Sequence, residues 1–308
     1  MGPALYTTLG SFERDDLGLI LPHEHVFVDL GPMEEANWRD ADPADVVDVM
    51  APEIERAREA GVTALVEATP EGVGRRVDVD LAVSEATDFP VVVPTGVYQE
   101  PSIPDWVRES SEDELLEWLL EDLTDGVGDT GVLAAWIKVS TDDDDPESLS
   151  PDEEKVLRAA ARAGAETGAL IGSHTLSGDL VHRQLDVVEA AGYTADRFVW
   201  IHAQADELAS HREIAERGAY VEYDWIGGDD QDDADYLDRI EAMVEAGFAD
   251  RLLLSQDRGW YDPSEPGGGE QRPYTYLTAE FLPKLRERLD DTTVRELTHD
   301  NPFDAYAR

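Results

Sequence analysis

The chain has 308 residues, of which 42% are hydrophobic, and it contains no cysteine. Its 24 basic residues are outnumbered by 70 acidic ones, so the formal net charge at pH 7 is −46. Such a charge repels nucleic acids and anionic membranes, and the expected partner is a small-molecule substrate. The lack of cysteine excludes disulfides and thiolate metal sites, which leaves histidine, carboxylates and modified lysine as metal ligands.

The acidic residues are spread through amphipathic segments such as 112–122 and do not form one tail. Only three of the basic residues are lysines. This acid-rich, lysine-poor composition is typical of a halophilic protein, in which high salt screens the charge repulsion. The N-terminal residues show no basic segment followed by an apolar one, and no apolar run approaches the ~18 residues of a membrane span. We therefore expect a cytoplasmic protein.

From Leu17 onward the sequence repeats one unit, a short apolar run followed by an amphipathic helix. The eight predicted strands are 17–30, 62–69, 91–98, 132–140, 169–175, 198–203, 219–226 and 252–257. The predicted helices are 43–60, 78–86, 105–123, 151–167, 179–191, 206–217 and 233–246, with Asp42 and Ser150 as N-caps. This rhythm predicts an α/β fold, a (β/α)8 TIM barrel forming a single domain over residues 1–308. An open doubly wound sheet is the alternative, but no Gly-x-Gly-x-x-Gly motif follows the first strand.

The first predicted strand carries two histidines, His23 and His25, on either side of Glu24. Residues two apart in a strand point to the same side, so both imidazoles project together while Glu24 points away. Two neutral imidazoles on one side suit a divalent transition metal. A pair of hydrogen-bonded histidines at a strand end is the alternative.

In barrels the catalytic groups sit at the C-terminal ends of the strands. The later predicted strands that end in candidate ligands do so at Lys138, His174, His202 and Asp257. The remaining histidines, His182, His211 and His299, fall on helices or near the C-terminus, where we expect solvated surface residues. The distribution predicts a metal site at the strand ends.

Lys138 stands in an apolar run of a chain that nearly avoids lysine. Burial lowers the pKa of an ammonium group and makes the neutral amine available. A neutral amine can add carbon dioxide to form a carbamate, whose two oxygens could bridge two metal ions. A lysine that reaches the barrel rim, or one that pairs with Glu67 or Asp257, is the alternative.

Asp257 follows the last predicted apolar run, which forces its carboxylate into a buried polar site. Such a carboxylate is unfavourable unless it is paired or bound to a cation. The functional interpretation is a metal-bound carboxylate that accepts a proton from a bridging water. The alternative is a salt bridge to Arg258 or Arg272.

The motifs around these residues resemble the phosphotriesterase family of the amidohydrolase superfamily, over about residues 9 to 302. They are His23-Glu24-His25, Lys138 in Ile-Lys-Val-Ser, His174 in Gly-Ser-His-Thr, His202 in Ile-His-Ala and Asp257 in Leu-Ser-Gln-Asp-Arg-Gly. The resemblance implies a barrel with a binuclear metal centre. It implies that one metal is held by His23, His25 and Asp257, the other by His174 and His202, with carboxylated Lys138 as the bridge.

Two features depart from this resemblance, and a third, Tyr98, extends it. Related lactonases and triesterases often carry an arginine after the aspartate of strand seven, where this chain has Trp225 after Asp224. The spacing that follows His202 is one residue shorter than in those enzymes. Tyr98, at the end of strand three, matches a lactonase pocket tyrosine, and a rim aromatic is the alternative. These departures bear on the substrate and not on the metals.

The expected function is that of a metal-dependent hydrolase with two divalent ions per chain, zinc first and manganese or cobalt as alternatives. A metal-bridging hydroxide would attack a lactone or related carboxylic ester, such as a sugar lactone, and Asp257 would take the proton. A phosphotriester is the alternative substrate. The sequence is also compatible with a mononuclear deaminase-type amidohydrolase, which does not need Lys138, and with a barrel that binds a ligand without turnover.

The substrate residues expected from the sequence are Tyr98, Trp225, Arg258 and Arg272. Tyr98 would donate a hydrogen bond to the leaving ring oxygen of a lactone. The segment 258–273 is expected to be a flexible loop that closes over the substrate. Arg258 and Arg272 would admit an anionic substituent. A homodimer is compatible with the sequence.

Overall fold

The computed structural model describes residues 2–32, 37–142, 148–228 and 232–308. Parallel strands form a barrel, and its order follows the chain in two linked sheets, β12-β3-β4-β5 and β6-β7-β8-β9-β10-β11. The third barrel strand is split into β5 and β6, and the eighth is split into β11 and β12. Because the two pieces of each strand belong to different sheets, the two sheets join into one ring. The barrel strands are β3 Leu19–Phe27, β4 Val62–Glu67, β5 Val91–Val92, β6 Pro94–Gly96, β7 Trp136–Ser140, β8 Leu170–His174, β9 Phe198–Ile201, β10 Tyr220–Tyr223, β11 Leu252–Leu254 and β12 Gly259–Tyr261.

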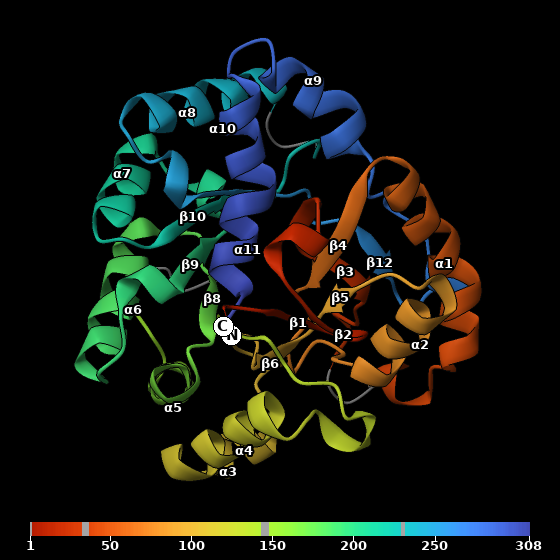
Figure 1. Ribbon diagram of the computed structural model, residues 1–308. Helices are drawn as coiled ribbons and strands as arrows, with labels where there is room; N and C mark the ends of the chain where they lie inside the picture. The colour runs from red at the N-terminus through yellow and green to blue at the C-terminus, as the bar shows by residue number, and fades with distance from the viewer. Residues whose placement is uncertain (1, 33–36, 143–147, 229–231) are drawn as a thin grey trace.

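Helices surround the strands on the outside (Figure 1). The helices between the strands are α1 Pro43–Glu59, α2 Val77–Thr87, α3 Asp105–Glu109, α4 Glu112–Thr124, α5 Pro151–Thr167, α6 Gly178–Ala190, α7 Leu208–Glu216 and α8 Asp233–Glu245. Their inward faces and the strands bury one large apolar cluster. The predicted TIM barrel is therefore confirmed. No helix in the described ranges is long and apolar enough to cross a membrane.

Local sequence signals explain where several helices begin and end. Asp42 accepts a hydrogen bond from the backbone N–H of Ala44, with Pro43 at the first helical position of α1. Ser150 and Glu153 form a reciprocal capping box at the start of α5. Gly168 ends α5 with φ +77°, a conformation that glycine adopts without steric cost. Both predicted N-caps are confirmed.

The single helix predicted over 105–123 is wrong, because the structure has two helices there, α3 and α4. Ser110 is extended, with ψ 145°, and Ser111 caps α4. The Ser111 side chain accepts from the N–H of Glu114, and the Glu114 carboxylate accepts from the Ser111 N–H. This capping box satisfies the donors of a new helix start and so favours a break.

The segment 258–273, predicted as a loop throughout, contains strand β12. Gly259 pairs with His25 in parallel register and forms an antiparallel bridge with Arg272. Gly259 has φ +94°, and a Cβ there would collide with the carbonyl oxygen of His25. Only glycine allows this close approach. The segment is thus tied to the first barrel strand beside the predicted metal ligands.

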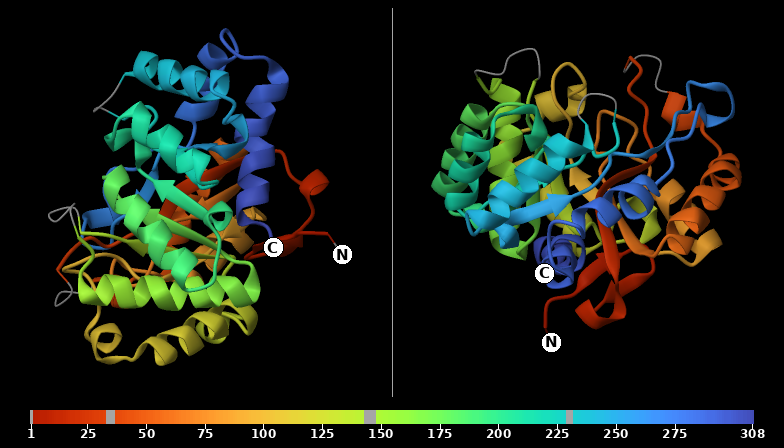
Figure 2. Two further views of the ribbon diagram at one scale, coloured as in Figure 1. Left: turned by 90° about the vertical axis from the view of Figure 1, so that its left-hand side faces the viewer. Right: turned by 90° about the horizontal axis from the view of Figure 1, so that it is seen from above.

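Short elements complete the two ends of the chain. A hairpin of β1 Leu5–Thr7 and β2 Gly10–Phe12 precedes the barrel. The C-terminal helical turns are Leu277–Phe281, α9 Leu282–Leu285, α10 Asp291–Arg295, Glu296–Asp300 and α11 Asn301–Tyr306. The remaining single turns are Arg14–Asp16, Asn37–Asp40, Gly128–Thr130, Ala195–Arg197, Ala203–Ala205, Ala249–Arg251 and Pro266–Gly268. Ala4 and Arg308 exchange two backbone hydrogen bonds of 3.1 Å, so the termini lie side by side (Figure 2).

The prediction that His182, His211 and His299 are surface residues is wrong for two of them. His211 is 0% exposed and His299 is 2% exposed, whereas His182 is partly exposed. His211 donates from Nε2 to the Ala203 carbonyl at 2.6 Å, and its Nδ1 lies 2.8 Å from the hydroxyl of Tyr223. It lies on the inward face of α7, and this burial lowers its pKa to about 4.

Candidate metal centre

The six residues predicted as metal ligands line one cavity of about 70 Å³ at the C-terminal ends of the strands. They are His23, His25, Lys138, His174, His202 and Asp257. They come from β3, β7, β8 and the turns that follow β9 and β11. Tyr98 and Trp260 also border the cavity. The topology therefore brings together groups that are more than 230 residues apart in sequence.

The imidazole rings form a continuous series around the cavity. The ring centroid of His23 lies 5.5 Å from that of His25 and 5.1 Å from that of His202. The His202 ring is in turn 4.4 Å from that of His174. The prediction that His23 and His25 project to one side agrees with this arrangement.

Three of these rings are fixed through Nδ1. His23 Nδ1 lies 2.9 Å from Glu222, His25 Nδ1 lies 2.7 Å from the Thr69 hydroxyl, and His202 Nδ1 lies 2.7 Å from Asp224. Burial alone would raise the pKa of Asp224, but His202 and His23 hold it below its usual range, so its carboxylate only accepts and Nδ1 of His202 carries the proton. The neutral ring then presents Nε2 as its acceptor, which is the atom that can bind a metal.

Asp257 points into the same space. Its Oδ1 lies 3.0 Å from His25 Nε2 and 3.8 Å from His23 Nε2. This oxygen is buried, yet it accepts no well-directed hydrogen bond from any residue that the structure describes. One ligand atom each from His23, His202 and Asp257 lie within 4.8 Å of one another. Imidazole nitrogens with a partly buried carboxylate are a donor set that fits zinc, manganese or cobalt.

The charges in this cavity are coupled. Burial alone would raise the pKa of Asp257, but the neighbouring His25 and His23 hold it well below its usual range. Burial alone would lower the pKa of His25, but Asp257 and Glu67 raise it to about 9. Burial also lowers the pKa of His23 well below 6.5. Asp257 thus takes its countercharge from imidazoles, and the salt bridge to an arginine that the sequence left open is not found among the described residues.

Lys138 is 2% exposed, and burial lowers the pKa of its ammonium to about 8 despite the carboxylates nearby. Among the described residues its Nζ makes no hydrogen bond and no ion pair, and the ring of Trp136 lies 5.9 Å away. The alternative pairing with Glu67 or Asp257 is therefore not present in the described chain. The geometry fits an amine that is available for carbamate formation.

Backbone strain collects at the same cavity. Four described residues other than glycine have positive φ, and three of them border the cavity: His202 at 65°, Asp257 at 52° and Trp260 at 85°. Each such residue is expected to raise the energy by about 1–3 kcal/mol, and such residues cluster at functional sites. The arrangement therefore indicates a constraint on where these side chains point.

Several residues of this site were missed by sequence reasoning. Glu222 and Asp224 on and after β10, Thr69 after β4, and Gln204 after His202 contact the candidate ligands or their partners. The available signal was two acids, two positions apart, in an apolar run. Such a spacing directs both carboxylates into the barrel.

The predicted substrate residues divide into two groups. Tyr98 lines the cavity, with its ring centroid 5.4 Å from that of His174. Trp225 stacks on His202 at 4.9 Å, and Arg272 lies 4.3 Å above the ring of Trp260. The Arg258 guanidinium donates to the carbonyl of Gly227. Trp225, Arg258 and Arg272 are not among the described residues that border the cavity, and their roles stay predictions.

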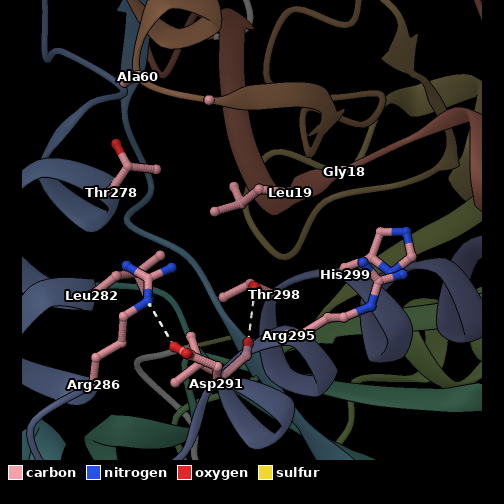
Figure 3. Close-up of a pocket in the computed structure, with 12 residues that line it drawn as sticks. Gly18, Leu19, Ala60, Thr278, Leu282, Arg286, Asp291, Arg295, Thr298 and His299 are labelled. Atoms are coloured by element: carbon pink, nitrogen blue, oxygen red, sulfur yellow. Dashed lines mark hydrogen bonds and ion pairs between the residues drawn. The ribbon is translucent and has the colours of Figure 1, made fainter.

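A second hollow of about 390 Å³ lies at the opposite end of the barrel, beside the starts of β3 and β4 (Figure 3). Arg286 lies 3.7 Å from Asp291 across it, and Thr298 donates to the Val294 carbonyl. Both candidate metal groups found in the described chain contain His23, so neither lies here. The chemistry of this hollow is that of surface ion pairs.

Comparison with known proteins finds one family over nearly the whole chain. The family model of the phosphotriesterase family matches residues 3–306. A phosphotriesterase homology protein of Mycobacterium tuberculosis is 28% identical, covering 99% of this chain and 98% of that protein. An aryldialkylphosphatase of Saccharolobus solfataricus is 26% identical, covering 94% and 88%. A mutant PTE-like lactonase of Deinococcus radiodurans has a solved structure with TM-score 0.88 and 28% identity, covering 98% and 99%.

Proposed function

The chain belongs to the phosphotriesterase family, and from this premise we propose that it hydrolyses a lactone or a related carboxylic ester with two divalent metal ions. Its relatives place it among hydrolases. The observation that carries the proposal is that six ligand-type side chains from separate strands line one small cavity. A single domain over residues 1–308 would hold the whole site.

The residues fit two ions in the way that the family resemblance implies. His23, His25 and Asp257 would hold one ion, His174 and His202 would hold the other, and Lys138, carboxylated on Nζ, would bridge them. Bound ions of this kind acidify water and polarise a carbonyl oxygen. A one-metal deaminase would leave Lys138, which is buried and has no ion pair among the described residues, without a role.

The chain's own groups supply the remaining requirements. Asp257 offers a buried oxygen that accepts no well-directed hydrogen bond from the described residues, so it can accept a proton from the attacking water. The Tyr98 hydroxyl would donate to the ring oxygen as the C–O bond breaks, and the product is a hydroxy acid. Apolar residues of the cavity wall, including Val28 and Val73, would exclude bulk water.

A phosphotriester is the second candidate, and the aryldialkylphosphatase among the relatives supports it. The lactone is favoured by the similarity to a PTE-like lactonase over 98% of this chain and by Tyr98 at the cavity. The anionic substituent, such as the phosphate of a sugar lactone, stays a prediction. Arg258 is engaged with a backbone carbonyl and Arg272 with Trp260.

A turnover screen tests the proposal. Protein stripped with a chelator is reloaded with zinc, manganese or cobalt in molar KCl and assayed on lactones, aryl esters and paraoxon-like triesters. The proposal predicts no turnover without metal and a higher kcat/KM for a lactone than for any triester. A higher kcat/KM for a triester than for any lactone would overturn the substrate assignment. Full turnover by the stripped protein would overturn the metal mechanism.

A further inference from the structure

Strand β10 and the residue that follows it place two carboxylates inside the barrel beside the candidate ligands. Glu222 and Asp224 are two positions apart, both are 0% exposed, and their side chains therefore share the inward side. A buried carboxylate is unfavourable unless it is paired, so each requires a partner inside the barrel. The partners of both are candidate metal ligands.

Glu222 contacts His23, a candidate ligand on the first barrel strand. Its Oε1 lies at hydrogen-bond distance, 2.9 Å, from His23 Nδ1. Asp224 Oδ2 lies 3.5 Å from the same nitrogen. The other oxygen of Glu222 is buried without a hydrogen bond from the described residues. The contact to His23 holds the imidazole ring with Nε2 on the side of Asp257, toward the cavity.

Asp224 contacts His202, the candidate ligand after β9, at both its backbone and its side chain. Its Oδ1 accepts from His202 Nδ1 at 2.7 Å and from Gln204 Nε2 at 2.7 Å. Its Oδ2 accepts from the backbone N–H of His202 at 2.9 Å. The Asp224 N–H donates back to Gln204 Oε1 at 3.2 Å. Asp224 therefore fixes both the ring and the left-handed backbone of His202, and Gln204 fixes Asp224.

His25 is supported differently. Its Nδ1 lies 2.7 Å from the hydroxyl of Thr69, which itself donates to the Phe27 carbonyl at 3.0 Å, so the hydroxyl oxygen accepts from His25. The nearer partner of His25 is therefore neutral, and Glu67 is 3.5 Å away. A carboxylate partner makes the opposite ring nitrogen a stronger donor to a metal than a neutral partner does.

We propose that Glu222 and Asp224 are positioning residues that make β10 the common support of two metal ions. Glu222 sets the affinity of the ion held through His23, and Asp224, with Gln204, sets that of the ion held through His202. The inference rests on the proposed function, which assigns His23 and His202 to different ions. Loss of such a partner lowers metal affinity by roughly 10–100-fold.

The test removes metal stepwise from the fully loaded protein with a chromophoric chelator and measures the two dissociation constants. The variants are Glu222→Gln and Asp224→Asn, with Glu53→Gln as the control, since Glu53 is 6% exposed and lies on α1 beside Arg56. Each variant should raise the dissociation constant of one ion by roughly 10–100-fold and leave that of the other ion near the wild-type value. Glu53→Gln should change neither.

A double-mutant cycle identifies which ion is affected. Glu222→Gln should add no further loss in a His23→Ala background but show its full effect in a His202→Ala background. Asp224→Asn should show the reverse pattern. If either variant fails to fold, Glu222→Asp and Gln204→Ala, which disturb the same contacts more mildly, must weaken the same ions.

The outcomes separate the role of β10 from the proposed function. If wild type binds two ions and both variants bind them with unchanged affinity, the role of β10 is overturned while the proposed function stands. If both variants weaken the binding of the same ion and leave the other unchanged, the assignment of Glu222 and Asp224 to different ions is wrong. A wild-type chain that holds fewer than two ions when fully loaded overturns the binuclear centre and the inference with it.

Discussion

Replacing Lys138 with methionine should make the metal-free protein more stable while it abolishes activity. The ammonium of Lys138 is buried with a pKa of about 8, against an ordinary value of 10.5. A lysine with a lowered folded-state pKa destabilises the fold fully below that value, and the penalty fades as the pH rises to the unfolded value. Methionine has a similar length and no charge, so Lys138→Met removes this penalty.

The size of the effect follows from the two pKa values. The difference between about 8 and 10.5 corresponds to about 3 kcal/mol of unfolding free energy at pH 7. For a chain of this size, that free energy raises the Tm by roughly 5 °C. The advantage of Lys138→Met should shrink between pH 8 and pH 10.5, because wild type gains stability over that interval.

The assay compares thermal and denaturant unfolding of stripped wild type and Lys138→Met in molar KCl, with carbon dioxide excluded so that no carbamate forms. Lys138→Ala, tested for activity after metal loading, should lose most turnover and recover part of it with a short carboxylic acid. A metal-free Lys138→Met that is several kcal/mol less stable than wild type would refute the reasoning, because it would mean that Lys138 stabilises the fold.

Kinetics, salt dependence and pH dependence test three further features of the chain. Tyr98→Phe should lower kcat for lactones by about tenfold or more with a smaller change in KM, and unchanged kinetics would remove Tyr98 from the mechanism. The Tm should rise steeply from dilute buffer to molar KCl, since the Debye length falls from ~30 Å at 0.01 M to ~3 Å at 1 M, and a Tm indifferent to salt would contradict the halophilic interpretation. His211→Ala should lower stability by about 2–3 kcal/mol without changing metal content, because it leaves the Tyr223 hydroxyl and the Ala203 carbonyl without this partner. With a folded pKa of about 4, His211 should also make stability fall as the pH drops from 6.5 to 4, and a flat profile in wild type would argue against its burial.

The order of the barrel strands could be predicted because each signal was local. Apolar runs, the cap at Asp42 and the capping box at Ser150 lie within a few residues of the elements that they define. The strand-end residues could be predicted because parallel strands bring their C-terminal ends to one side. Strand β12 could not, because it depends on Gly259 lying against the backbone of His25.

The roles of the residues that contact the candidate ligands or pack behind them could not be predicted from local patterns either. The spacing of Glu222 and Asp224 places both carboxylates inside the barrel, but the role of Glu222 comes from its contact with His23, which lies on a distant part of the chain. His211 is a polar residue on an amphipathic helix, but the inward face of α7 buries it against Tyr223. In both cases a tertiary contact decides the role of the side chain.

The most direct test of the central claim is the number of metal ions per active chain, measured together with the state of Lys138. The protein is loaded with zinc or cobalt in the presence of carbon-13-labelled bicarbonate, and metal content, carbamate signal and lactone turnover are followed on the same sample. The account predicts two ions and one labelled carbamate per chain at full activity, with both lost in Lys138→Ala. Full activity with one ion per chain and no carbamate would contradict it.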